Sequence, residues 1–427
     1  MHSAEALRAA RWFGGKSRPI VETRIVDSAC WAGDAVVSLV DVAYAHGPSE
    51  TYVVADRFED PSVGRALVRH FEGATLPTQR GGALVFRPTH IFHAVARERL
   101  EPIGLLHGEQ SNTSLRFGDA LILKLFRRLQ FGPNPDVEIG WFLTEHTAFS
   151  GTPPVAGSLT YVTPEGEQAD LVLLQQFEPN RGDAWTTTLA RATSIVDGAP
   201  IEATLPSIRR LAATTAELHV ALASGTGDFS PERIDAPQVN TWLATLEDEV
   251  RLTARALAAR GVPVDESALI ERAAGLTSLE GSLETRHHGD YHLGQVLERD
   301  DGGYVIIDFE GEPSRPLGQR REKHTALRDV AGMLRSFDYA RHAALRASGH
   351  SGDVRRSRVA ADWYAAARET FLQEYLAVAR GQPGLIPAAI DAPLAALELE
   401  KAAYEVRYEL NNRPDWLPIP LAAFASR

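Results

Sequence analysis

The sequence predicts an α+β protein in which strands dominate the first part of the chain and helices dominate the rest. Up to about residue 182, apolar runs rich in β-branched residues, such as VVSLVDVAY and ETYVVADRF, are typical of strands. From about residue 186, long stretches carry apolar residues at the 3.6-residue period of helices. A polar stretch, residues 287–313, interrupts the helical part. We therefore predict three parts, residues 1–88, 89–182 and 183–427.

Composition narrows the class of protein. Hydrophobic residues make up 44% of the 427 residues, which is ordinary globular composition and allows a sizeable core. The formal charge of −12 argues against sequence-independent binding to nucleic acid or anionic membranes. The single cysteine, Cys30, excludes an intrachain disulfide and a Cys-rich zinc site. The chain has neither a signal-peptide core nor a run of about 18 apolar residues, so we expect a cytoplasmic protein without a membrane span.

Two strands and a helix are predicted in the middle of the strand-rich part. The stretch SLRFGDALILKLFRRL reads as two strands joined by a Gly-Asp turn and followed by basic residues. In NPDVEIGWFLTEHTAF, Asn134 is expected to cap a helix and Pro135 suits its first turn. The stretch ADLVLLQQF then reads as a buried strand.

The helical part contains several long periodic stretches. We expect helices over residues 207–224, 238–260, 267–286, 358–380 and 393–411.

The polar stretch contains a predicted β-hairpin. In GQVLERDDGGYVIIDFEG, two apolar runs flank Asp301-Gly302, a favoured two-residue hairpin turn. That turn places Gln295 directly opposite Asp308, with Cβ atoms about 4.5–5.5 Å apart. An amide oxygen and a carboxylate at that separation suit Mg²⁺.

The stretch HHGDYHLGQ presents Asp290 just before this hairpin, and the arrangement suits phosphoryl transfer. That chemistry needs a cation on the phosphates, a carboxylate near the acceptor hydroxyl and a positive group on the phosphate tail. Lys124, in an apolar strand, supplies the positive group, and Glu138 on the following helix is its predicted partner. The small polar hairpin HGEQSNTSLRF, with Ser111 and Asn112, is suited to covering phosphates.

Three stretches, HGDYHLGQVL, VIIDFEGEPSRPL and LRDVAGMLRSFDYA, resemble the maltokinase family. So do RWFGGKSR near the N-terminus, LILKLFRRL with NPDVEIGWFLTE, and YEVRYELNNRPDWLPIP near the C-terminus, so that the resemblance covers almost the whole chain. Members of this family are aminoglycoside-phosphotransferase-like sugar kinases. The resemblance implies a bilobal, protein-kinase-like fold with an N-terminal cap, a β-rich N-lobe and a helical C-lobe.

The resemblance also implies roles for individual residues. Asp290 would be the catalytic base, Asp308 the principal Mg²⁺ ligand and Gln295 the second ligand, where many relatives have Asn. Glu310 would add a carboxylate near the metal. The residues implied to bind ATP are Lys124, Glu138, Ser111, Asn112, Gln175, Gln176 and Phe177. Those implied to shape the sugar pocket are His292, Tyr404, Glu405, Tyr408, Glu409 and Trp416.

The family phosphorylates maltose at its anomeric hydroxyl with ATP, and the maltose 1-phosphate feeds α-glucan synthesis. The resemblance therefore implies a small sugar as the substrate, with ATP and Mg²⁺ as cofactors. It also allows association with a trehalose-converting enzyme, and both monomer and dimer stay open.

Other interpretations of the same residues stay open. A kinase for another sugar, such as glucosamine or glucose, would share this core. A non-catalytic nucleotide-binding regulator is the alternative outside enzymes.

Two motifs suggest other sites. His288 and His292 are four residues apart and raise the hypothesis of a zinc hydrolase, but Gly289 argues against the helix that such a site needs. FGGKSR is not a phosphate loop, because Ala10 stands where that motif requires glycine.

Overall fold

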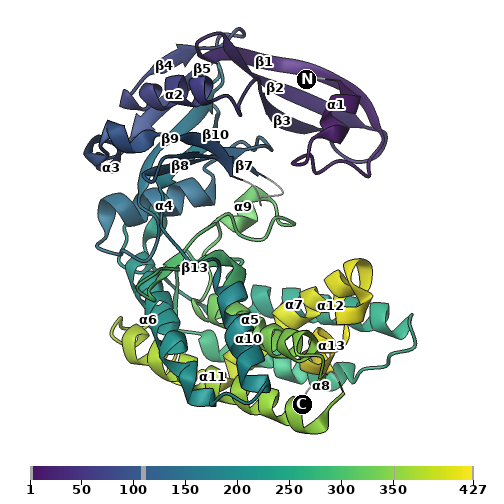
Figure 1. The fold of residues 1–427 in the computed structure, drawn as a ribbon. Helices are drawn as coiled ribbons and strands as arrows, with labels where there is room; N and C mark the ends of the chain where they lie inside the picture. The colour runs from purple at the N-terminus through teal and green to yellow at the C-terminus, as the bar shows by residue number, and fades with distance from the viewer. Residues whose placement is uncertain (1–2, 107–111, 351, 426–427) are drawn as a thin grey trace. The chain divides into compact units, whose positions relative to one another are not determined.

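The computed structural model describes residues 3–106, 112–350 and 352–425 of the chain. It divides into two compact units. Unit 1 comprises residues 1–179 and 314–320, and unit 2 comprises residues 180–313 and 321–427. Unit 1 is rich in strands and unit 2 in helices (Figure 1), which confirms the α+β fold class. No helix among the described residues is long and apolar enough to cross a membrane.

Unit 1 contains two antiparallel sheets. The first has the order β1-β2-β3 and is drawn in purple in Figure 1, and the second has the order β4-β5-β9-β10-β8-β7-β6. The strands are β1 (Ile20–Ala32), β2 (Ala35–Tyr44), β3 (Glu50–Ala55), β4 (Thr75–Pro77), β5 (Ala83–Pro88), β6 (Ile103–Leu106), β7 (Asn112–Phe117), β8 (Leu121–Phe126), β9 (Val155–Val162) and β10 (Gln168–Gln176). Its helices are α1 (Ala4–Ala9), α2 (Pro61–Arg69), α3 (His90–Ala94), α4 (Pro135–His146) and α9 (Leu317–Arg320).

The predicted boundary at residue 88 cuts through one sheet and one core. Strands β4 and β5 precede that residue, yet they belong to the seven-stranded sheet. Side chains from both sheets, among them Trp31, Val53, Leu123 and Leu174, form one hydrophobic cluster. Because apolar burial is shared across the predicted boundary, the first two predicted parts form a single unit.

The three-stranded sheet is joined to the strand that carries Lys124. The N–H of Val53 donates to the carbonyl of Arg127 at 2.8 Å, and the N–H of Leu129 donates to the carbonyl of Thr51 at 2.9 Å. Residues 127–129 directly follow β8, so backbone hydrogen bonds tie the N-terminal sheet to the end of this strand.

Two local predictions in unit 1 are confirmed. Strands β7 and β8 pair across the Gly-Asp turn, where Gly118 has a φ of 53°. Helix α4 begins at Pro135, and the side chain of Asn134 accepts a hydrogen bond from the N–H of Asp136 at 2.9 Å. An Asn cap satisfies a backbone donor that has no partner within the helix.

Unit 2 is built around helix α10, which packs against α5, α11 and α12. Its helices are α5 (Ala184–Val196), α6 (Leu205–Leu222), α7 (Ala236–Ala258), α8 (Glu266–Ala273), α10 (Leu327–Ala347), α11 (Val354–Ala379), α12 (Asp391–Asn412) and α13 (Pro418–Ala425). Two short strand pairs complete the unit, β11 (Glu232–Arg233) with β12 (Leu283–Glu284) and β13 (Val296–Glu298) with β14 (Tyr304–Ile306).

The helix predicted over residues 267–286 is wrong in its second half. Helix α8 ends at Ala273, a 3₁₀ segment follows over Ala274–Leu279, and β12 lies beyond it. A Cβ atom on Gly275 would lie 2.3 Å from the carbonyl of Ala392, and Gly281 has a φ of 85°. A left-handed glycine does not continue a helix, so the apolar period alone overestimated its length.

The β13–β14 hairpin forms with a register one residue away from the prediction. Val296 pairs with Ile306, and the N–H of Ile307 donates to the carbonyl of Gln295 at 2.9 Å. Gln295 therefore lies opposite Ile307 in the ladder. The turn has three residues, 300–302, because the N–H of Arg299 donates to the carbonyl of Gly303.

Candidate active site

One face of α10 holds the loop that carries Asp290. The carboxylate of Asp329 accepts hydrogen bonds from the N–H groups of His288, at 2.7 Å, and Gly289, at 3.0 Å. One turn on, a Cβ atom on Gly332 would lie 2.5 Å from the carbonyl of Tyr291, so only glycine allows this approach. The hydroxyl of Ser336 accepts from the N–H of Leu293 at 3.1 Å. Spacings of three and four residues place all three positions on one face of the helix.

Asp329 is itself fixed by a buried histidine. His219 Nε2 donates to Asp329 at 3.2 Å, and the hydroxyl of Tyr375 lies 2.9 Å from His219 Nδ1. Burial alone would raise the pKa of Asp329, but its hydrogen bond with His219 and the nearby imidazoles hold that pKa below its ordinary value. Asp329 therefore stays ionised and anchors the loop as an acceptor.

The carboxylate of Asp290 contacts a lysine that the sequence analysis did not select. Lys401 Nζ, on α12, lies 3.0 Å from Asp290 Oδ1 and 3.1 Å from Glu312 Oε1. Burial alone would lower the pKa of Lys401, but the carboxylates of Asp290, Glu312 and Glu405 raise it above its ordinary value. Lys401 is therefore a permanent cation between two acidic groups.

A signal for Lys401 was present in the sequence. Glu398, Lys401, Glu405 and Glu409 follow one another at spacings of three or four residues, so they share one face of α12. The other three residues are acids. A lysine on a helix face that also carries buried residues needs a nearby carboxylate, because a buried charge without a partner is costly. Which carboxylate it meets was not visible, because Asp290 lies 111 residues earlier.

Gln295 and Asp308 come together despite the altered register. Gln295 Nε2 donates to Asp308 Oδ2 at 3.0 Å. Asp308 has a φ of 67°, a left-handed conformation that Asp adopts more readily than most residues. Because β14 ends at Ile306, the turn of the backbone at Asp308 brings its carboxylate back toward Gln295.

These side chains fit a hard divalent cation. Both Gln295 and Asp308 are partly buried and provide oxygen atoms. A carboxylate oxygen of Asp308 also lies within 4.8 Å of one on Glu310. Two carboxylates and an amide oxygen in one small region form a donor set suited to Mg²⁺. The assignment of the three residues as ligands stays a prediction.

In unit 1, Lys124 forms a buried ion pair. Lys124 Nζ lies 2.9 Å from Asp136 Oδ2, and both residues are buried. Asp136 is in the first turn of α4, two residues before the predicted partner Glu138. Asp136 is thus a partner that the sequence analysis missed, although its position in the first turn of a capped helix after the Lys124 strand was visible. The pairing of Lys124 with Glu138 stays a prediction.

The other predicted nucleotide contacts lie in the same unit. Asn112 is the first residue of β7, and Ser111 lies outside the described residues. The N–H of Gln176 donates to the carbonyl of Pro154 at 2.9 Å, and the N–H of Phe177 donates to the carbonyl of Ala120 at 2.8 Å. Gln175 pairs with Ile122 in the sheet. The N–H groups of Gln176 and Phe177 are thus already bonded within the unit, and the binding of adenine by this segment stays a prediction.

The histidines near Asp290 brace the loop. His288 Nε2 donates to the carbonyl of Ile307 at 3.0 Å, and His292 Nδ1 accepts from the N–H of Gly294 at 3.0 Å. Burial lowers the pKa of His292, which keeps its ring neutral. In the part of the chain that the structure describes, no cluster with metal-ligand spacing includes a histidine, so the structure offers nothing to the zinc hypothesis.

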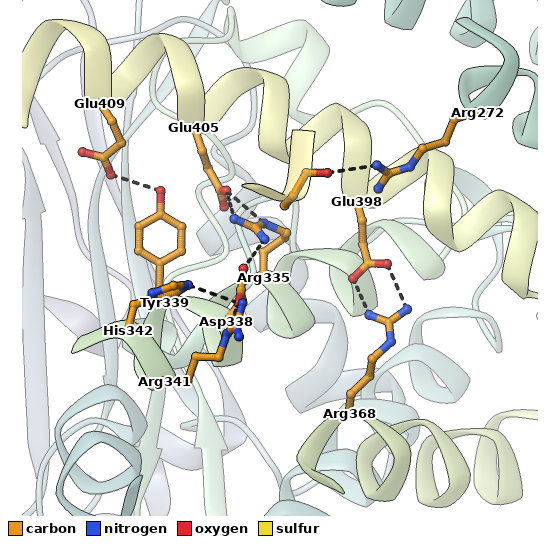
Figure 2. A network of polar contacts seen from close by, with 11 residues as sticks. Arg272, Arg335, Asp338, Tyr339, Arg341, His342, Arg368, Glu398, Glu405 and Glu409 are labelled. Atoms are coloured by element: carbon orange, nitrogen blue, oxygen red, sulfur yellow. Dashed lines mark hydrogen bonds and ion pairs between the residues drawn. The ribbon is translucent and has the colours of Figure 1, made fainter. Parts of the chain in front are cut away.

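Among the predicted sugar contacts on α12, the two acids have hydrogen-bond partners within unit 2. Glu405 accepts from Arg335 at 2.8 and 3.0 Å, while Glu409 accepts from Tyr339 at 3.1 Å and from Arg413 at 2.6 Å, as Figure 2 shows for Arg335 and Tyr339. These acids are thus engaged inside the unit.

The predicted aromatic sugar contacts differ from one another in their surroundings. The ring of Trp416 stacks on Tyr339 at 6.2 Å. Tyr404 and Tyr408 stack on each other at 6.3 Å, Tyr408 is 44% exposed, and Lys401 Nζ lies 5.1 Å from the centre of the Tyr404 ring. Tyr404 therefore lies beside Lys401, the partner of Asp290, whereas Trp416 packs on Tyr339. Contact of any of these residues with a sugar stays a prediction.

Comparisons with known proteins find a family and several similar proteins. The model of the phosphotransferase enzyme family (APH) matches residues 102–347. A glucosamine kinase of Mycolicibacterium smegmatis is 30% identical over 327 residues, which are 74% of this chain and 77% of that protein. A glucosamine kinase of Streptacidiphilus jiangxiensis is 28% identical over 331 residues, which are 73% of this chain and 70% of that protein.

The fold is also that of a solved kinase. The structure of a glucosamine kinase in complex with glucosamine, ADP and inorganic phosphate matches with a TM-score of 0.73 at 22% sequence identity, covering 98% of each chain. This likeness confirms the predicted kinase-like fold, with a β-sheet N-lobe and a helical C-terminal region.

Proposed function

Because the chain belongs to the phosphotransferase enzyme family, we propose that it transfers the γ-phosphoryl group of ATP to a hydroxyl group of a sugar, with glucosamine as the preferred acceptor. The observation that carries the proposal is the placement of Asp290. Its carboxylate is partly buried on a loop that Asp329 fixes, and His288 of the same loop donates to the carbonyl of Ile307, the residue before Asp308. Asp308 in turn accepts from Gln295. The two curated glucosamine kinases support the choice of a monosaccharide.

Asp290 would act as the general base. The sugar hydroxyl attacks the γ-phosphorus, its proton moves to the Asp290 carboxylate, and the bond from the γ-phosphorus to the bridging oxygen breaks to release ADP. A positioned base of this kind contributes about 10²–10⁴-fold to the rate.

The remaining cofactor roles follow from the donor atoms present. Gln295 and Asp308, with Glu310 beside them, would hold Mg²⁺, which neutralises phosphate charge when bound. In unit 1, Lys124 would supply a positive charge for the phosphates, and its pairing with Asp136 keeps the ammonium oriented. Asn112 and the carbonyl groups of Gln175 and Phe177 are our candidates for further nucleotide contacts.

Maltose is the second candidate acceptor. The N-terminal RWFGGKSR and the C-terminal YEVRYELNNRPDWLPIP resemble the maltokinase family. The stacked Tyr404 and Tyr408 on α12 also offer ring faces that suit a sugar of two rings. On this alternative the product is maltose 1-phosphate for α-glucan synthesis, and association with a trehalose-converting enzyme becomes the partner to test.

The test is a sugar panel with phosphorus NMR of the product. ADP release is measured with ATP, Mg²⁺ and glucosamine, glucose or maltose, and the spectrum identifies the phosphorylated hydroxyl. We expect turnover with glucosamine, and Asp290→Asn should lower kcat by about 10²–10⁴-fold.

Asp301→Asn is the matched control, because Asp301 is an exposed acid at the tip of the same hairpin. It should leave kcat unchanged. Full activity of Asp290→Asn would refute the role of the base, and turnover with maltose alone would replace glucosamine by the second candidate.

A further inference from the structure

Lys401 lies between two carboxylates, one that precedes the β13–β14 hairpin in the chain and one that follows it. Asp290 precedes β13, and Glu312 follows β14. Lys401 Nζ is 3.0 Å from the first carboxylate and 3.1 Å from the second. One ammonium group therefore joins the start and the end of the segment that also holds Gln295 and Asp308.

Helix α12 holds this ammonium in place through ion pairs on both sides of Lys401. Glu400 pairs with Arg328 at 2.7 Å, and Glu405 pairs with Arg335 at 2.8 Å. Glu398 pairs with both terminal nitrogens of Arg368, one of them at 2.9 Å (Figure 2). Since three acids around Lys401 are tied to α10 and α11, the helix has little freedom to withdraw the lysine.

The charge arrangement explains why a cation is needed here. Two ionised carboxylates within reach of one nitrogen repel each other, and in a partly buried site this repulsion is only weakly screened. Asp290 has an exposed side-chain fraction of 22% and Glu312 one of 8%. An ammonium between them offsets the repulsion and gives each carboxylate a charge-assisted hydrogen bond.

We propose that Lys401 is a positioning residue for the reaction proposed above. Its ammonium group fills a cation slot formed by the carboxylates of Asp290 and Glu312. In this slot it holds the Asp290 carboxylate in its productive orientation. The proposal rests on the proposed function for its effect on catalysis, but the slot itself is a property of unit 2 alone. Lys401 does not exchange a proton with the sugar. It acts through Asp290, so its removal should lower kcat more than it alters the KM for ATP.

The experiment uses Lys401→Ala, which empties the slot without adding a bulky group. We expect kcat for the sugar to fall about 100-fold with an unchanged KM for ATP, since a misplaced catalytic group costs a factor of this size. Ethylammonium should then restore at least about tenfold of the lost kcat in a saturable manner, because it is an N–H-bearing cation that fits within the space of the removed three-carbon ammonium fragment. Tetramethylammonium carries the same charge without N–H donors and should not restore activity.

Lys323→Ala is the matched control. Lys323 is another partly buried lysine of unit 2 that is ion-paired to Glu232. This variant should keep its kcat within about twofold and gain nothing from ethylammonium. Loss of activity in Lys401→Ala without selective rescue would overturn the proposal, as would unchanged kcat.

A second readout does not depend on the reaction. Ethylammonium should raise the thermal midpoint of Lys401→Ala above its value in tetramethylammonium at equal concentration, because a ligand that binds the folded state stabilises it. The wild type should show no such difference. If no sugar is phosphorylated by the wild type, the proposed function fails, and the thermal shift still decides whether the slot exists. Equal midpoints in the two salts would refute the slot.

Discussion

Two buried arginines, one in each unit, are accommodated in opposite ways. Arg127 in unit 1 is 5% exposed and donates to the Thr113 hydroxyl at 2.8 Å and to the Val53 carbonyl at 3.2 Å. Its guanidinium lies 4.6 Å from the ring centre of Trp12, and among the described residues it has no ion pair. Burial lowers the pKa of Arg127 to about 9.

Arg335 in unit 2 is 2% exposed and is surrounded by acids. It lies 2.6 Å from Asp338 and 2.8 Å from Glu405. Burial alone would lower its pKa, but these two carboxylates raise it. The first arginine is held by neutral dipoles and an aromatic face, the second by opposite charges. The energetic role of a buried cation therefore depends on which groups are left without a partner when it is removed.

The largest effect is expected for Arg335→Met. Its removal leaves Asp338 and Glu405 buried beside each other without their shared cation, and breaking a buried pair in this way costs about 3–5 kcal/mol. Urea denaturation followed by circular dichroism measures the free energy of unfolding. Arg355→Met, at an exposed position of α11, should change it by less than about 0.5 kcal/mol. A loss below about 1 kcal/mol for Arg335→Met would show that Asp338 and Glu405 do not need this cation.

A smaller effect is expected for Arg127→Met. The variant leaves a hydroxyl and a carbonyl without their donor, at about 1 kcal/mol each, but it also removes an uncompensated buried charge, which offsets part of that loss. We expect the free energy of unfolding to fall by less than half as much as in Arg335→Met, measured in the same way. Equal losses of unfolding free energy in the two variants would show that the neighbouring carboxylates do not determine the cost of removing a buried arginine.

The smallest effect concerns an acid that faces another acid. Glu284 pairs directly with Glu232 across β11 and β12, and burial, together with Glu232, raises the pKa of Glu284 to about 7. The folded state therefore binds a proton that the unfolded state loses above its ordinary pKa of 4.5, so stability falls as the pH rises from about 4.5 to 7.

Glu284→Gln removes this dependence. Its stability relative to the wild type should increase across that pH range in denaturant titrations and stay constant above it. Glu280→Gln, an exposed position on the same connection, should show no such trend. A parallel pH dependence of Glu284→Gln and the wild type would contradict the prediction.

Local patterns predicted the fold well where the cause is local. The cap at Asn134, the turn at Gly118 and the helices α6, α7, α11 and α12 follow from residue type and period, whereas α10 was not among the predicted helices. The hairpin register did not, because the Asp-Gly turn uses three loop residues and not two. The predicted contact of Gln295 with Asp308 nevertheless forms, because the left-handed backbone of Asp308 redirects its carboxylate.

The partners of charged residues were the part that local reasoning could not supply. Glu405 and Glu409 are paired with Arg335 and Tyr339, which lie 70 residues earlier in the chain. Their predicted contact with the sugar stays a prediction. Lys124 was assigned Glu138, and the structure adds Asp136 on the same helix. Charge type predicts that a partner is needed, whereas its identity depends on how distant helices pack.

The Lys401 contact also bears on the order in which the site is assembled. Gln295 and Asp308 are 13 residues apart, so their hairpin closes a short loop and can form early. Asp290 and Lys401 are 111 residues apart, and their contact requires α10 and α12 to have docked. A chain that ends between residues 313 and 400 contains both Gln295 and Asp308 but lacks Lys401. The ion pair that we propose to position Asp290 is therefore among the last contacts that synthesis of the chain allows.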